Sequence, residues 1–156
     1  MFESFSLNKT YQVLLILLAF LLPLTVFGAN LVIVIIVLIW FFSGNLKLKI
    51  TKILRNNLMI ASIIFFGLHL LGLFWTEDIS WGLHIVHKMW YFLILFPVLF
   101  SIVEKKYIKY YVTAFLFAIS ITEVFSYLIW FQLISPFGSA EIYNPTPFMS
   151  HISYNP

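Results

Sequence analysis

The stretch YQVLLILLAFLLPLTVFGANLVIVIIVLIWFF, residues 11–42, carries no charged side chain and decides the fold of this chain. As one straight helix at about 1.5 Å per residue it would be roughly 48 Å long, whereas the hydrocarbon core of a bilayer is about 30 Å thick. Pro23 and the Gly28-Ala29-Asn30 step can bend or end a helix near its middle. We therefore predict two short membrane segments, 11–27 and 30–43, that form a tight hairpin. The alternative is one kinked and strongly tilted helix.

The rest of the chain has the same character. It is 62% hydrophobic and 20% aromatic, with a mean hydropathy of +1.01, whereas soluble domains are about 45–50% apolar. Three further apolar stretches, 58–75, 89–103 and 111–134, are typical of membrane spans. Basic and apolar residues alternate over 43–57, which predicts an amphipathic surface segment. We expect an all-α, polytopic integral membrane protein with about five membrane segments in a single domain.

The positive charges predict the orientation of these segments. The net charge of +3 comes from residues dispersed in short loops, without the basic stripe that nucleic-acid binding needs, so we expect no nucleic-acid partner. The hairpin places nearly all basic residues on one face: Lys9, Lys47, Lys49, Lys52, Arg55, Lys105, Lys106 and Lys109. Only Lys88 lies opposite. The positive-inside rule makes the crowded face and the N-terminus cytoplasmic, and it places loops 76–88 and 135–156 outside. The kinked-helix alternative moves only Lys9.

Several chemistries lack the residues they need. The chain has no cysteine, so it has no disulfide, thiolate nucleophile or cysteine-bound metal. His84 and His87 could start a metal site but have no third ligand at a suitable offset, and we expect neither metal nor cofactor. Walker, dinucleotide-binding and HExxH motifs are absent, which excludes ATP hydrolysis, nicotinamide chemistry and zincin proteolysis on motif grounds. Either histidine alone could act as a general base.

The outward loop 76–88 contains the best candidate for a binding site. Asp78 or Ser80 can cap a helix that runs into Met89. Such a helix would place three side chains on one face: Trp81, His84 and Lys88. An indole, an imidazole and an ammonium together suit a phosphorylated, lipid-linked or sugar-bearing ligand. The alternative is an interfacial helix whose indole anchors in the headgroups and whose lysine reaches to water.

Two ionisable residues fall inside predicted spans. Buried charge is costly in hydrocarbon, so we expect His69 and Glu123 to face the protein interior or a cavity. For His69 the simpler interpretation is a neutral, hydrogen-bonded packing residue. Glu123 has Ser120, Thr122 and Ser126 beside it, which would equally suit a satisfied carboxyl, a proton path or a binding cavity.

The order of these features resembles the O-antigen ligases and the related O-antigen polymerases of bacterial envelopes. The similar strings run over nearly the whole chain: Leu18–Leu24, Ala29-Asn30, Leu38–Trp40, Leu68–Asp78, Lys88 before the span with Pro97, and Phe148–Pro156. The last string is similar to the start of that family's next membrane segment. We therefore expect residues 1–156 to be the N-terminal part of a longer protein.

The resemblance implies an inner-membrane glycosyltransferase of lipopolysaccharide biosynthesis. Such an enzyme moves a glycan from undecaprenyl diphosphate to the lipid A-core acceptor in the periplasm, without metal or nucleotide. The family's catalytic Arg and His residues lie in a later periplasmic loop, so we expect the catalytic residues beyond Pro156 and no activity from residues 1–156 alone. Lys88 would bind the diphosphate.

Two other functions remain open from the residues. An O-antigen or polysaccharide polymerase shares the donor and topology but uses a second lipid-linked glycan as acceptor. A transporter would use Glu123 and His69 as coupling residues, and it predicts that Glu123 lines a cavity.

Overall fold

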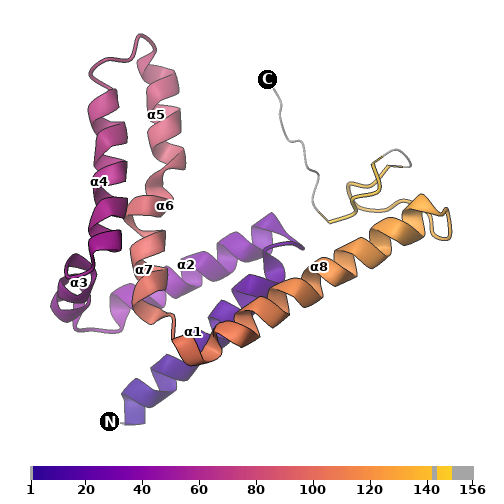
Figure 1. Ribbon diagram of the computed structural model, residues 1–156, viewed down its shortest axis with the longest axis horizontal. Helices are drawn as coiled ribbons and strands as arrows, with labels where there is room; N and C mark the ends of the chain where they lie inside the picture. The colour runs from indigo at the N-terminus through magenta and orange to yellow at the C-terminus, as the bar shows by residue number, and fades with distance from the viewer. Residues whose placement is uncertain (1, 142–143, 149–156) are drawn as a thin grey trace. The chain divides into compact units, whose positions relative to one another are not determined.

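The computed structural model describes residues 2–141 and 144–148, and this part of the chain is all-helical (Figure 1). It contains no strand, only an isolated antiparallel bridge between Glu141 and Asn144. The helices are α1 (Phe2–Leu21), α2 (Val26–Phe42), α3 (Leu46–Leu54), α4 (Asn57–Gly72), α5 (Ile79–Lys88), α6 (Trp90–Leu93), α7 (Leu95–Ile102), the 3₁₀ helix η1 (Lys105–Tyr107) and α8 (Ile108–Trp130). They form two compact units, Met1–Ile36 with Glu104–Pro156 and Val37–Val103, each described below by itself.

Residues 11–42 form two helices, as the two-segment prediction expected, but the break lies earlier than predicted. It falls at residues 22–25, around Pro23, and Gly28-Ala29-Asn30 belongs to α2. Proline cannot donate the hydrogen bond that would continue α1. The Thr25 hydroxyl then accepts a hydrogen bond from the Gly28 N–H at 3.3 Å, which caps the first turn of α2. A threonine cap, rather than the flexibility of Gly28, decides where the second helix starts.

In the first unit α1 and α8 lie side by side (Figure 1). The buried face of α1 is built from Tyr11, Leu15 and Leu18, which follow the spacing of one helical stripe. Ala118 is completely buried on α8, where its small side chain lets the two helices approach closely. Such packing provides shape complementarity but little to specify the register of two apolar helices.

A chain of polar side chains joins the same two helices. Gln12 is only 3% exposed, and its Oε1 accepts a hydrogen bond from the Tyr111 hydroxyl. Its Nε2 donates to Asn8 Oδ1 at 3.1 Å, and Asn8 Nδ2 donates to a carboxylate oxygen of Glu104. Glu104 also forms an ion pair with Lys106 at 2.8 Å. The network specifies one alignment of α1 with the start of α8, because any slip would leave a buried amide unpaired.

In the second unit α4 runs beside the α5–α7 segment in the opposite direction (Figure 1). The Asn56 side chain caps α4 by accepting from the N–H groups of Leu58 and Met59, at 2.9 and 3.3 Å. Halfway along, the buried Ser62 hydroxyl donates to the Phe92 carbonyl at 2.6 Å. This bond lies close to the break at Ile94 between α6 and α7, where helix hydrogen bonding is interrupted.

The predicted amphipathic segment 43–57 contains helix α3. Its Lys49 ammonium donates to the Trp40 carbonyl and to the Ser43 hydroxyl, both at 2.6 Å, and so caps the C-terminal end of α2. The Trp40 indole in turn donates to the Ser101 hydroxyl at 2.8 Å. Lys52 donates to the Ser101 carbonyl at 3.3 Å. Two of the four basic residues of this segment thus bind backbone carbonyls at helix ends.

Among the described residues, only the helical segment Lys105–Trp130 is by itself long and apolar enough to cross a bilayer. Two bent pairs also qualify if each is one span: α2 with α3, bent by 111°, and α5 with residues 90–102, bent by 46°. Residues 7–21 and α4 are shorter apolar helices. The possible membrane association of the chain therefore rests most directly on α8.

Removing the Tyr111 hydroxyl tests the polar network. We expect Tyr111→Phe to lower the free energy of unfolding by about 1–3 kcal/mol, because a buried carboxamide oxygen loses its donor. The measurement is the unfolding midpoint of the detergent-solubilised chain, followed by circular dichroism. Tyr110→Phe is the matched control, because Tyr110 is an exposed neighbour on α8. Equal midpoints for the two variants would show that the network does not stabilise the α1–α8 pair.

Candidate functional site

The start of α5 has the cap that the sequence predicts. Asp78 is the residue before the helix, and its Oδ1 accepts a hydrogen bond from the Trp81 N–H at 3.0 Å. Of the two predicted alternatives, Asp78 is therefore the cap and Ser80 lies inside the first turn. The Thr76 hydroxyl donates to the Asp78 carbonyl at 3.1 Å, which orders the short link before the helix. The cap determines which residues of α5 share a face.

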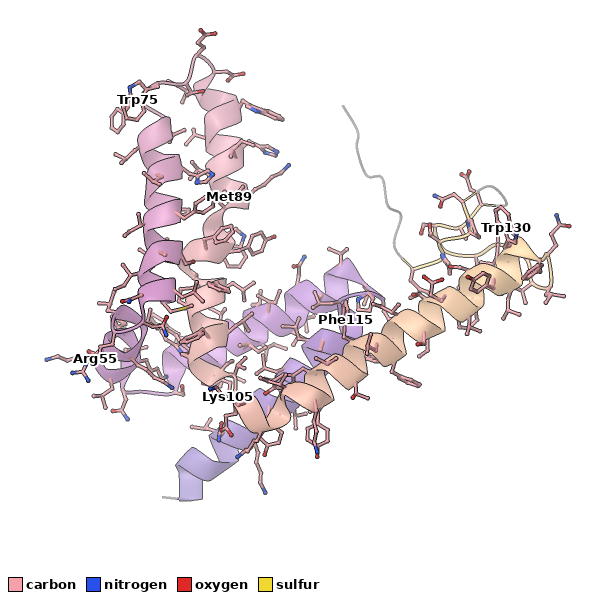
Figure 2. The ribbon with its side chains drawn as sticks, viewed as in Figure 1. Arg55, Trp75, Met89, Lys105, Phe115 and Trp130 are labelled. Carbon is pink, nitrogen blue, oxygen red and sulfur yellow. The ribbon has the colours of Figure 1, made fainter. Side chains whose placement is uncertain are left out.

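The helix predicted within the loop 76–88 is confirmed, and it ends just before Met89. Only residues 73–78 link α4 to α5, and α5 packs along α4. Figure 2 shows Met89 about midway along this helical pair, between Trp75 at one end and Arg55 at the other. Lys88, the residue before it, is the last residue of α5. The apolar side of α5 favours packing on α4 over lying flat at an interface.

Gly82 is the point where α5 comes close to the link that follows α4. A Cβ atom added to Gly82 would lie 2.7 Å from a methyl of Leu73 and 3.2 Å from the methyl of Thr76. Any larger side chain here would force these two side chains of the link to move. Glycine at this position thus lets α5 lie closely against the link.

The structure brings Trp81 and His84 together. Their ring centroids are 5.4 Å apart and the rings are inclined by 31°. Trp81 is 61% exposed, and His84, His87 and Lys88 are exposed as well. Lys88 follows Trp81 by seven residues, so it lies on the same side of α5 two turns further on. Within the part of the chain that the structure describes, Lys88 has neither an ion pair nor a hydrogen-bond partner.

A cavity of about 340 Å³ lies between α4 and α5 on the other side of Trp81. It is lined by Leu68, His69, Gly72, Leu73, Thr76, Trp81, Gly82, Ile85 and Val86. Most of this lining is apolar, and its polar side chains are the His69 imidazole, the Trp81 indole and the Thr76 hydroxyl. Trp81 therefore stands between an apolar cavity and the polar stripe, defined here as His84, His87 and Lys88.

His69 lies in this cavity, and the sequence did not predict that it would join Trp81. Its Nδ1 is hydrogen-bonded to the Phe65 carbonyl at 2.9 Å, and its ring contacts the Phe65 ring edge-on at 4.6 Å. These contacts agree with the predicted packing role of His69, although its other ring nitrogen is free to act in the cavity. Gly82, a small residue where α5 lies close to the link after α4, was the signal in the sequence that the chain turns back on itself here.

Glu123 lies apart from these residues, in the other compact unit. It belongs to a stripe of α8 with Ile119, Thr122 and Ser126, and this stripe lines a second cavity of about 250 Å³. Among the described residues no group of three His, Asp or Glu side chains is placed to hold a metal ion. The string Phe148–Pro156 that entered the family resemblance lies, after its first residue, outside the described residues.

Filling the close approach at Gly82 tests the geometry of the site. We expect Gly82→Val to lower the free energy of unfolding by about 1–3 kcal/mol more than Gly67→Val, because only the first forces atoms together. Gly67 is the matched control, since a Cβ there would meet nothing within 4 Å. Thermal unfolding in detergent measures both. If Gly82→Val is no worse than its control, α5 does not approach the link after α4 as described.

The candidate site thus combines an apolar cavity, an indole–imidazole pair in contact and an exposed lysine on two packed helices. No protein-family model, curated protein or solved structure matched the chain.

Proposed function

We propose that the chain crosses the bacterial inner membrane several times and forms part of a glycosyltransferase that takes its glycan from a lipid carrier. The first support is apolar surface. Phe27 and Phe42 are each 78% exposed and Phe74 is 83% exposed, and similar side chains cover most helices. Exposing so much apolar surface to water is unfavourable, whereas exposing it to lipid is not. As one bent helix, residues 79–102 would be roughly 36 Å long, enough for a hydrocarbon core of about 30 Å.

The charge distribution supports a periplasmic site. If α4 leaves the cytoplasm at Asn57, then Phe74 and Trp75 reach the outer interface, where aromatic side chains are enriched. The described outward links, residues 73–78, 131–141 and 144–148, contain no lysine or arginine. With Lys88 inside a helix rather than in a loop, the positive-inside bias is stronger than the sequence count suggested.

The proposed function depends on how deep in the membrane the polar stripe lies. A lysine near the bilayer centre costs about 2.5–3.5 kcal/mol on insertion scales, so such residues face a water-filled cavity or another part of the protein. His84, His87 and Lys88 all lie on exposed parts of α5, away from the cavity with α4. We infer that the polar stripe faces an aqueous chamber open to the periplasm.

A lipid diphosphate has a charged headgroup and an apolar tail. These match the polar stripe on one side of Trp81 and the apolar cavity on the other. The Lys88 ammonium supplies a point charge for the diphosphate, and His84 supplies a hydrogen-bond donor. The apolar cavity between α4 and α5 offers a place for the first isoprene units. We propose undecaprenyl diphosphate as the carrier and the lipid A-core as acceptor, as in an O-antigen ligase, with catalytic Arg and His residues outside residues 1–156. A polymerase would share this donor site and differ in its acceptor.

The placement of the polar stripe in the membrane can be tested by cysteine labelling. The chain has no cysteine of its own that would react with the label. In proteoliposomes, we expect a water-soluble maleimide to modify His87→Cys about tenfold or more faster than Leu71→Cys, because a thiol in hydrocarbon does not ionise. Leu71 is an exposed apolar residue of α4. Mass spectrometry of the labelled chain gives both rates. Similar rates would show that the polar stripe does not face a separate aqueous chamber.

Transfer of glycan tests the function. In the complete enzyme, we expect Lys88→Ala to lower glycan transfer and binding of the lipid diphosphate donor by about tenfold or more, since a charge-assisted hydrogen bond is lost. Lys47→Ala, which removes an exposed lysine of α3, should leave both unchanged. The proposal fails if Lys88→Ala transfers glycan and binds donor like the unmodified enzyme.

A further inference from the structure

The cavity beside Glu123 has a different chemistry from the site on α5. Four of its lining residues, Ile119, Thr122, Glu123 and Ser126, recur every three or four positions and so form one stripe along α8. The other lining residues are Pro23, from the break between α1 and α2, and Thr146, Pro147 and Phe148, from the segment after α8. All of them belong to one compact unit. The cavity, of about 250 Å³, is therefore formed within a single unit.

Three polar side chains of this stripe, Thr122, Glu123 and Ser126, offer hydrogen-bond acceptors to the cavity. Within the described part of the chain the Glu123 carboxylate and the Ser126 hydroxyl have no hydrogen-bond partner. The Thr122 hydroxyl donates to the Ile119 carbonyl at 2.7 Å, so its oxygen can still accept a hydrogen bond. Three acceptors thus lie on successive positions of one helical stripe.

We propose that this cavity binds a primary ammonium group. An ammonium has three N–H donors and a positive charge, which match the carboxylate and the two hydroxyl oxygens. The ring of Phe148 in the cavity lining is a further favourable surface for a cation. An anion would meet the carboxylate, and a bare calcium ion needs six or more oxygen ligands, whereas only one carboxylate lines the cavity.

The position of Glu123 on α8 makes the binding of an ammonium group there favourable. If α8 crosses the bilayer, Glu123 lies seven residues, roughly 10 Å, from the outer end at Trp130. An unpaired carboxylate at that depth is costly, whereas an ammonium bound in the cavity would neutralise it. Ethanolamine headgroups of phospholipids and amino sugars of glycans both present this chemistry at the outer surface. The inference needs α8 to cross the membrane but does not depend on glycan transfer.

Lipid retention tests the inference directly. The 156-residue chain is purified in mild detergent with equimolar phosphatidylethanolamine and phosphatidylglycerol, and the retained lipid is measured by native mass spectrometry. We expect about tenfold preference for phosphatidylethanolamine, the size of effect that one charge-assisted hydrogen bond provides. Glu123→Gln, which keeps the shape of the side chain, should abolish the preference, and Ser126→Ala should reduce it.

Two controls separate the outcomes. Glu141→Gln removes a carboxylate that does not line the cavity and should leave the preference intact. Added glucosamine separates the two ligand sources: displacement of the phospholipid indicates an amino-sugar site, and continued retention indicates a headgroup site. Equal retention of the two lipids by the unmodified chain, or an unchanged preference in a folded Glu123→Gln variant, would overturn the inference.

Discussion

The pairing of α5 with α4 is the contact on which the candidate site depends. It brings Trp81 of α5 and His69 of α4 to the lining of one cavity, and it leaves His84, His87 and Lys88 exposed on α5. At Gly82 the absence of a side chain lets α5 lie close to Leu73 and Thr76 of the link between the two helices. The sequence predicted the helix but not its packing against α4, and this packing combines an apolar cavity with exposed polar side chains.

Each compact unit uses a few polar contacts to select one pairing among helices that are apolar on most sides. In one unit the buried Gln12 amide is paired with Tyr111, and in the other the Ser62 hydroxyl donates to the Phe92 carbonyl. Apolar packing alone discriminates weakly between registers when lipid is the solvent, because leaving a leucine in hydrocarbon costs nothing. A hydrogen bond that only one register can satisfy supplies the missing specificity.

The sequence predicted local features well and long-range ones poorly. Helices separated near Pro23, the cap at Asp78 and the amphipathic α3 all follow from residues within a few positions of one another. The packing of α5 on α4 does not follow from such residues, because an i, i+3, i+7 stripe is equally compatible with an interfacial helix and with one packed on a neighbour. Two further features depend on which helices pair. His69 and Trp81 line one cavity, and hydrogen bonds link Gln12 to Glu104. Spacing along the chain carries no information on which helices pair.

The two candidate sites differ in charge, and so do the ligands that they favour. The exposed face of α5 carries a lysine and two histidines, so it favours an anion such as a diphosphate. The stripe of α8 carries one carboxylate with hydroxyl oxygens and no basic residue in its cavity, so it favours a cation. Each cavity is formed within a single unit, because the lining residues of each come from that unit alone. The chemistry of each site therefore follows from its own helices, and the two sets of residues suit ligands of opposite charge.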